Sequence, residues 1–301
     1  MAAFFLLWAA FPALAQVRGI YSPGSTLTQA GTISGSGFGY SNQFWYSSSD
    51  RLFGPNGNPL PLNAPVSIKV DNNTFSYVPK FKLLGANLQF TVDLAFSNGR
   101  YSVIDPFLGR PGVQGSGAGL TNTNFVPFSL GWHLKWADIL AGYSVYAPTG
   151  YYKPGGSDNV SSGYWTNSLQ AGTTLYLTKS KATQVSVFDV YAWDTTQQGT
   201  TVKPGQNDSL DYSLTQTFSF GKSDKWSFQA GPAGYGQWQT TRNTGQSAIR
   251  EALKYSIEGA GFTMNLSAPH GISVGVNALW EYGACSTFQG HTVVVTASFS
   301  L

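Results

Sequence analysis

The chain has 301 residues and a formal net charge of +3, with 10% charged and 15% aromatic residues. A soluble domain carries about 25% charged residues. The lower fraction here indicates a β-rich protein with few charged side chains on one face of its sheet. The small net charge gives no reason to expect nucleic-acid binding. The single cysteine, Cys285, excludes an intrachain disulfide and a cysteine-based metal site.

The first fifteen residues, MAAFFLLWAAFPALA, are apolar and end in the small-x-small pattern of a secretory cleavage site. The stretch is shorter than the ~20 apolar residues of a spanning helix. We expect residues 1–15 to be a signal peptide and the mature chain to begin at Gln16, with a buried N-terminal helix as the alternative. No later run approaches the length of a membrane helix, so a membrane-embedded chain would cross as strands.

The segment VPFSLGWHLKW, residues 126–136, alternates apolar residues with polar or small ones. A period of two indicates a strand with one apolar and one wet face. Its length matches a tilted strand that crosses a bilayer, whereas strands of soluble proteins are usually about five or six residues long. The same alternation recurs at 75–83, 88–96, 210–220 and 272–282, and in each of these the charges share the polar face.

Twelve candidate strands follow along the mature chain. They lie near 35–47, 73–83, 86–96, 125–136, 138–148, 162–177, 183–193, 208–220, 225–240, 250–263, 271–283 and 291–301. Short turns alternate with longer loops, and the loops after the first and third strands exceed twenty residues. Short periplasmic turns, long extracellular loops and an even strand count are typical of a transmembrane antiparallel β-barrel.

We therefore predict an all-β fold: a single outer-membrane barrel domain over residues 16–301, preceded by a periplasmic or lumenal segment at 16–34. A soluble β-sandwich is the alternative, but it does not need strands this long. In hydrocarbon every backbone N–H and C=O must find a partner, so the sheet has to close and the last strand has to pair with the first.

If the apolar faces point to lipid, the polar faces line the lumen. In the strand at 183–193 we place Asp189 inward and Phe188, Val190 and Ala192 outside. Charges of both signs argue against a strongly ion-selective pore, and a network of paired charges that braces the barrel is equally compatible with them. The lumen-lining candidates are Lys80, Lys82, Asp93, His133, Lys135, Asp189, Asp211, Tyr235, Gln237, Lys254, Glu258 and Glu281.

Tryptophans gather near the predicted strand ends, where indole rings at a membrane interface keep the apolar body in lipid and the N–H among headgroups. An aromatic-substrate slot is the alternative for inward rings such as Tyr235. The closing strand, HTVVVTASFSL, ends on Phe299 and Leu301, which we expect to act as an assembly signal. The predicted aromatic girdle comprises Trp45, Trp136, Trp165, Trp193, Trp238 and Trp280.

The sequence carries no P-loop and no nucleophile elbow. The three histidines, His133, His270 and His291, show no metal-ligand spacing. We therefore expect no catalytic residue, no metal and no cofactor. An outer-membrane enzyme remains the third hypothesis, and it would require a serine within hydrogen-bond reach of a lipid-facing histidine.

The segment PTGYYKPGGSDNVSSGYWT at 148–166, with GIYSPG near residue 19, GYGQWQTT at 234–241 and the terminal strand, resembles the outer-membrane family associated with the meta-pathway of phenol degradation. The resemblance implies a barrel channel involved in uptake. The same residues include turn formers, so shaping an outer loop is an alternative to ligand contact. The residues that carry the resemblance are Pro148, Thr149, Gly150, Tyr152, Gly155, Asn159, Trp165 and Thr166.

Three functions remain open at this point. The first is a channel in the bacterial outer membrane for passive uptake of small aromatic or hydrophobic solutes, gated by the Gly-rich loop 97–124. The second is a sealed structural or adhesive barrel, and the third is an enzyme. The expected partners are outer-membrane lipids, the barrel-assembly machinery and a small-molecule solute, with no nucleic acid.

Overall fold

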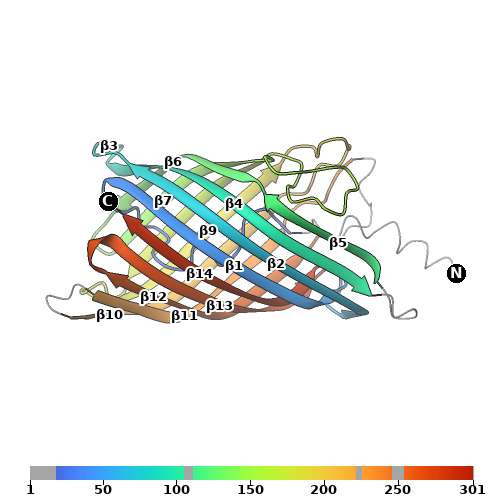
Figure 1. Ribbon diagram of the computed structural model, residues 1–301. Coiled ribbons are helices and arrows are strands. Elements are labelled where there is room, and N and C mark those ends of the chain that lie inside the picture. Colours follow the sequence, from blue (N-terminus) through green and yellow to red (C-terminus); the bar gives the residue numbers. More distant parts are fainter. Residues whose placement is uncertain (1–17, 105–110, 222–225, 246–253, 301) are drawn as a thin grey trace.

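The computed structural model of the chain describes residues 18–104, 111–221, 226–245 and 254–300 (Figure 1). The predicted signal peptide and Leu301 lie outside the described residues. Among the described residues, no helix is long and apolar enough to cross a membrane.

The described chain is built from antiparallel strands that form one closed sheet. Strand β14 pairs with β1, and β2 pairs with β4, which completes the ring. The two-residue β3 pairs the start of β4, and β5 pairs the upper part of β4 where β6 pairs its lower part. Closure therefore leaves 12 strands around the wall, which confirms the predicted barrel. The strands are β1 (Gly37–Phe53), β2 (Pro59–Val78), β3 (Lys82–Leu83), β4 (Ala86–Ile104), β5 (Pro111–Leu120), β6 (Thr123–His133), β7 (Ala137–Ala147), β8 (Thr166–Tyr176), β9 (Thr183–Asp194), β10 (Asn207–Phe220), β11 (Trp226–Gln239), β12 (Ser256–Ala268), β13 (Ile272–Cys285) and β14 (Phe288–Ser300).

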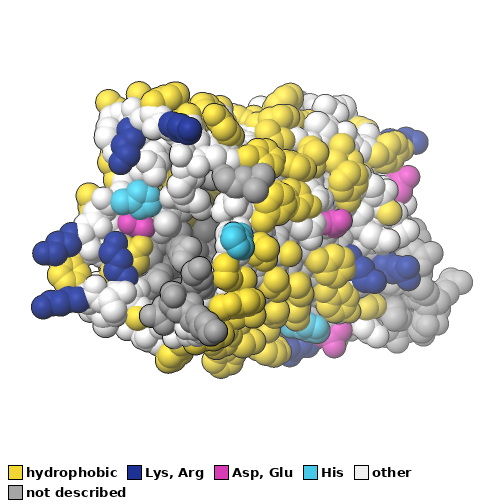
Figure 2. Space-filling model, turned by 60° about the vertical axis from the view of Figure 1, so that its left-hand side comes forward, with side chains coloured by type: hydrophobic (Ala, Val, Ile, Leu, Met, Phe, Trp, Pro, Cys, Tyr) yellow, Lys and Arg dark blue, Asp and Glu magenta, His cyan; other side chains and the backbone are white. Residues whose placement is uncertain are grey.

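The two faces of the wall differ as a bilayer requires. Large apolar side chains such as Phe96, Phe262 and Trp280 are exposed on the outside, whereas Val294 on the inner face of β14 is fully buried. Figure 2 shows hydrophobic side chains covering much of the barrel surface, with most Lys and Arg toward the two ends. Exposing such a large apolar surface to water would be unfavourable, so this belt is the lipid-facing surface.

The two mouths carry different connections. The mouth where β1 begins and β14 ends has short turns at 134–136, 177–182 and 269–271. The opposite mouth carries the longer connections at 148–165, 195–206 and 240–255. By the usual orientation of such barrels, the first mouth is periplasmic and the second extracellular.

The predicted loop between the first two strands is wrong. Strand β1 continues to Phe53 and β2 starts at Pro59, so the connection is a tight turn in which Gly54 N–H donates to Asn58 O over 2.9 Å and Gly57 takes a φ of +73°. Pro59, Pro61 and Pro65 interrupt the start of the missed region, and proline is unusual in a strand interior. In the rest of it the polarity is inverted, because Val66, Ile68 and Val70 face inward and the polar residues between them face outward.

The predicted gating loop at 97–124 is also wrong. Most of it is strand, because β5 pairs with β4 from Phe96↔Leu120 to Ile104↔Pro111. Two glycines on the inner face of β5 leave room for the connection at 148–165: a Cβ on Gly115 would lie 2.4 Å from Ser157 O, and one on Gly117 would lie 2.7 Å from Asp158 O. The segment is a wall extension that supports another loop.

The alternation at 126–136 breaks at its first residue. A register shift between Phe125 and Phe128 places a bulge in β6, and Val126 is only 6% exposed. Val126 therefore faces the lumen with its partner Thr91, whereas the sequence placed it outside. Strand β6 ends at His133, and residues 134–136 form the periplasmic turn.

Candidate functional site: a segment inside the lumen

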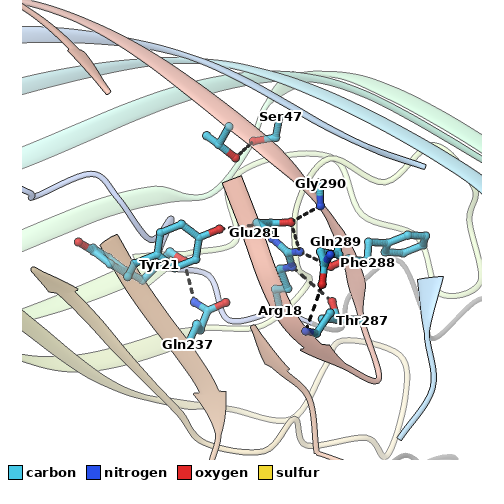
Figure 3. Close-up of polar contacts among 12 residues, drawn as sticks. Arg18, Tyr21, Ser47, Gln237, Glu281, Thr287, Phe288, Gln289 and Gly290 are labelled. Carbon is cyan, nitrogen blue, oxygen red and sulfur yellow. Dashed lines mark hydrogen bonds and ion pairs between the residues drawn. The ribbon is translucent and has the colours of Figure 1, made fainter. Parts of the chain in front are cut away.

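Residues 18–36, here called the plug segment, lie inside the barrel. Their extracellular end is held at Arg18 (Figure 3). The guanidinium donates to both oxygens of Glu281 over 2.6 and 3.1 Å and to Phe288 O over 2.6 Å. Glu281 Oε1 also accepts from the Tyr235 hydroxyl over 2.7 Å. Only 4% of the Glu281 side chain is exposed, so the carboxylate depends on these donors.

A tyrosine next to Arg18 completes this end. Gly19 N–H donates to the Tyr255 hydroxyl, which in turn donates to Asn207 Oδ1 over 2.8 Å. Burial is the main cause that raises the pKa of the Tyr255 hydroxyl, so the group stays protonated and keeps both roles.

The middle of the plug segment is anchored on one carboxylate. Asp211 on β10 is fully buried. It accepts from the Tyr21 hydroxyl and from Gly24 N–H, both over 2.7 Å, and from Thr26 N–H over 3.0 Å. All three of these donors belong to the plug segment. Gln237 Nε2 donates to Tyr21 O over 3.0 Å from the next strand.

Apolar contacts lie on both sides of this anchor. Leu27 packs in a buried cluster with Tyr235, Ile257 and Leu279. Tyr21 and Ala30 pack in a second cluster with Phe188 and Val190 of β9. Gly24 fits between the two because it has a φ of +88° and because a Cβ there would lie 2.5 Å from Leu279 Cδ1.

The periplasmic end is held by a second carboxylate, Asp138 of β7. It accepts from the Thr32 hydroxyl over 2.8 Å and from the Tyr176 hydroxyl over 2.7 Å, and it pairs with His133 Nδ1 at 3.1 Å. Gly31 N–H donates to Thr174 Oγ1 over 3.1 Å. The plug segment is thus tied to the wall from the extracellular mouth to the periplasmic one.

The wall formed by β1, β2, β4 and β5 is covered less closely. The plug segment is tied to it where Gln43 Nε2 donates to Ser25 O over 3.2 Å. Toward the extracellular mouth, a cavity of about 340 Å³ separates this wall from Arg18 and the loop around Val160. Its inner lining includes Ser47, Ile68 and Tyr101, and Ile68 is 40% exposed although it faces inward.

Six predicted lumen residues do face inward, and three of them form hydrogen bonds with the plug segment. Asp211, Gln237 and Glu281 bind it, and Tyr235 supports Glu281. Asp93 accepts from Thr74 and Asn124 of the wall. The six are Asp93, His133, Asp211, Tyr235, Gln237 and Glu281.

The four predicted lumen lysines are not in the lumen. Lys80 and Lys135 lie in periplasmic turns and Lys82 lies in β3 at the same end. Lys254 precedes β12 at the extracellular mouth, where its ammonium donates to Thr240 O over 3.1 Å. Long cationic side chains gain hydration at the mouths that a buried lumen wall would not provide.

Asp189 was placed on the wrong face. Phe188, Val190 and Ala192 are 6%, 1% and 4% exposed and face the plug segment, which puts Asp189 on the outer face beside Leu210. The plug segment covers the inner face of β9 with apolar groups, while Val187 and Trp193 keep the outer face largely apolar, so alternation cannot distinguish the two faces of this strand. Glu258 is also outward, because its neighbour Ile257 is fully buried in the plug cluster.

Five of the six predicted girdle tryptophans stand on the outside. Trp136, Trp165 and Trp280 are 46%, 47% and 57% exposed. Trp193 contacts the outward Tyr143 with ring centroids 6.4 Å apart, and Trp238 alternates with the fully buried Gln237. Trp45 is the exception: at 7% exposure, opposite Val294, it faces the lumen.

Phe299 lies on the outer face of the closing strand, opposite Tyr40, with ring centroids 5.5 Å apart. It is 39% exposed. The pairing joins the last strand to the first at the periplasmic rim. Its role as an assembly signal stays a prediction.

The residues that carried the family resemblance shape the connection at 148–165. Asn159 closes the loop by accepting from Lys153 N–H over 2.7 Å and donating to Lys153 O over 2.9 Å. Thr149 donates to Thr121 O over 2.9 Å, and a Cβ on Gly150 would lie 2.1 Å from Leu120 O. Gly155 takes a φ of +72°. The remaining members of the set are Pro148, Tyr152, Trp165 and Thr166, of which Thr166 donates to Asp194.

The sequence reasoning missed Arg18, Tyr21 and Asp138. The first two belong to a stretch without strand periodicity, and the available signal was an arginine and buried-type residues such as Leu27 and Ile33 in a segment that otherwise resembles a loop. Asp138 begins the predicted strand at 138–148 but was not among the predicted lumen residues. Asp138 is only 2% exposed, and Thr32 of the plug segment, which donates to it, helps to cover it.

The histidine contacts in the described residues give no support to catalysis. His133 contacts Asp138 and Asn87, and His291 lies against the Tyr46 ring with centroids 6.3 Å apart. No group of three or more His, Cys, Asp or Glu among the described residues is arranged to hold a metal ion.

A closed antiparallel barrel with an apolar belt defines the class: this is a β-barrel protein of the bacterial outer membrane. A profile of the family described as "Putative MetA-pathway of phenol degradation" matches residues 49–297. The chain belongs to this family. No curated protein sequence matches the chain.

Solved barrels resemble the structure at low sequence identity. An outer-membrane channel from Pseudomonas putida F1 is similar with a TM-score of 0.73 and 13% identity, over 93% of this chain and 100% of that chain. The translocator domain of the autotransporter NalP from Neisseria meningitidis is similar with a TM-score of 0.50 and 10% identity, over 100% of this chain and 97% of that chain. At these identities the likeness concerns the fold.

Proposed function

We propose that the protein is an outer-membrane channel for passive uptake of small solutes, closed by the plug segment and opened when that segment leaves the wall of β7–β13. The observation that carries this proposal is the nature of the attachment. Arg18, Asp211 and Asp138 hold the segment through side-chain contacts, and it is not a strand of the sheet. It can therefore detach while the barrel stays closed.

Aromatic or hydrophobic solutes are the proposed cargo. The family description, which names phenol degradation, supports this. So does the cavity of about 340 Å³, because Ile68, Tyr101 and Phe288 give it apolar lining and Ser47 gives it hydroxyl groups. Small-molecule sites commonly combine an apolar wall with a few polar groups.

Single-channel recording tests the plug with a matched pair of variants. Asp211→Asn removes the charged acceptor for three donors of the plug segment, and Asp189→Asn removes an outward carboxylate from the neighbouring strand. Loss of charge-assisted bonds costs roughly 1–3 kcal/mol, so the open probability of Asp211→Asn should rise about tenfold or more. The Asp189→Asn channel should behave as wild type.

A sealed structural barrel predicts a different result. It would give no conductance steps in wild type or in Asp211→Asn, although both proteins fold, as judged by the heat-modifiable migration of intact barrels. Equal behaviour of the two variants would also contradict a plug held by Asp211. For the cargo, liposome uptake of phenols, fatty acids and sugars compares the candidates directly, and a preference for sugars would refute the aromatic assignment.

A further inference from the structure

The charges that face the lumen have one sign. In the described strands, the inward carboxylates are those of Asp93, Asp138, Asp194, Asp211 and Glu281. Asp138 lies at the periplasmic end, Asp211 faces the middle of the plug segment, and Asp194 ends β9 at the extracellular mouth. The acids are therefore distributed along the length of the barrel.

Basic side chains in the described strands do not balance them. Lys69 and Arg100 stand at outward register positions, opposite Asn98 and Ser67, although Arg100 also borders the cavity near the extracellular mouth. Arg51 pairs with Asp50 at the rim. Of the inward wall positions in the described residues, His133 is the one that can carry positive charge. The mixed lining that the sequence suggested came from lysines that lie at the mouths.

The compensation inside the barrel is mostly neutral. Asp211 is satisfied by hydroxyl and N–H donors of the plug segment and Asp93 by Thr74 and Asn124. At the extracellular mouth Asp194 accepts from Thr166 and also interacts with the charge of Lys203 in the connection at 195–206. Glu281 has a permanent cation as its partner, and that cation is Arg18 of the plug segment itself. When the plug segment moves away, the arginine leaves with it and the carboxylates remain.

We propose that the open lumen selects by charge: it passes cationic and neutral small solutes in preference to anions, so that uncharged aromatic compounds are substrates and aromatic carboxylates are disfavoured. The inference rests on the proposed function. Acidic linings favour cations in water-filled channels, and low-dielectric walls strengthen the field of a narrow lumen. Screening at physiological salt acts over about 8 Å, so the effect is largest at low ionic strength.

The test needs an open channel whose charge is unchanged. Gly24→Val supplies it, because a side chain there would collide with Leu279 at a φ of +88°, which a β-branched residue resists. In a potassium chloride gradient at low salt, reversal potentials should give a permeability ratio of potassium to chloride of roughly three to ten. Adding Asp211→Asn and Glu281→Gln removes two of the five inward carboxylates and should lower the ratio, whereas adding the outward Asp189→Asn should leave it unchanged.

Liposome influx of glucosamine, glucose and gluconate gives a second readout with solutes of similar size and different charge. Influx should fall in that order. If Gly24→Val folds and yet conducts no ions, the plugged-channel function fails. If it conducts with a ratio at or below one, or if gluconate enters as fast as glucosamine, the channel stands and the charge selectivity is refuted. Should Gly24→Val fail to assemble, the openings of Asp189→Asn and wild type at high voltage supply the same ratio.

Discussion

The two sides of the barrel wall are built for different tasks. The wall of β7–β13 presents buried carboxylates and apolar clusters that match the plug segment, and its strands have 11 to 14 residues. The wall of β1, β2 and β4 has strands of 17, 20 and 19 residues and faces a cavity instead. The first side holds the closing element, and the second leaves the space along which a solute can pass.

The largest rise in open probability should come from adding a single methyl group to the plug segment, at Gly31. Gly31→Ala places a Cβ 2.1 Å from the Asp138 backbone oxygen on the plugged side, where strand backbone cannot yield. Gly99→Ala, on the cavity side, places its Cβ 3.7 Å from Ile68, an ordinary contact. We expect Gly31→Ala to raise the single-channel open probability by about two orders of magnitude, as a loss of several kcal/mol implies.

Gly99→Ala serves as the control and should match wild type. A closed Gly31→Ala channel would show that the periplasmic end of the plug segment moves aside without opening a path.

The next largest change in open probability should come from breaking the ion pair between Arg18 and Glu281. Arg18→Met removes the guanidinium and leaves the Glu281 carboxylate buried with the donors Tyr235 and Gly290. Because Arg18 is 33% exposed, we discount the loss to about 1–3 kcal/mol, which corresponds to a rise in open probability of roughly ten- to a hundredfold. The double variant Arg18→Met/Glu281→Gln removes the uncompensated charge and should recover part of the closed population. No recovery would mean that the other Arg18 contacts, to Phe288 O and Thr287, hold this end.

The cavity side gives a smaller and opposite effect. Ser97 lines the cavity from β4, and a Ser97→Phe side chain should narrow the passage without touching the plug anchors. We expect solute influx into liposomes to fall severalfold while open probability stays at the wild-type value. Unchanged influx through Ser97→Phe would place the cavity outside the conduction path.

Sequence reasoning succeeded where one physical demand acted alone. In β13 and β14 lipid contacts the outside, and apart from Leu279 and Val294 the inner face carries polar or small groups, so alternation predicted the strands and the closure with β1. It failed where a second environment replaced lipid or water. In the upper part of β2 the apolar residues face the cavity and the polar ones face outward, so the polarity is inverted. The inner face of β9 is covered by apolar groups of the plug segment, so that strand is apolar on both faces.

The candidate site was only half predictable for the same reason. Asp211 and Glu281 sit on strands and could be assigned to the lumen from their neighbours. Arg18 and Tyr21 lie in a segment without period, and their role exists only once the barrel encloses them. The lysines were misplaced because a polar position near a strand end does not distinguish the lumen wall from its mouth.

The smallest effect should come from Thr32. Its hydroxyl donates to Asp138 Oδ2, but this carboxylate keeps Tyr176 and His133 when the donor is lost. Thr32→Val preserves the shape of the side chain and removes about 0.5–1.5 kcal/mol of hydrogen bonding, so open probability should rise by less than about tenfold. Thr32→Ser retains the hydroxyl and should match wild type. An effect of Thr32→Val as large as that of Arg18→Met would mean that the periplasmic anchor, rather than the ion pair at the extracellular mouth, controls release of the plug segment.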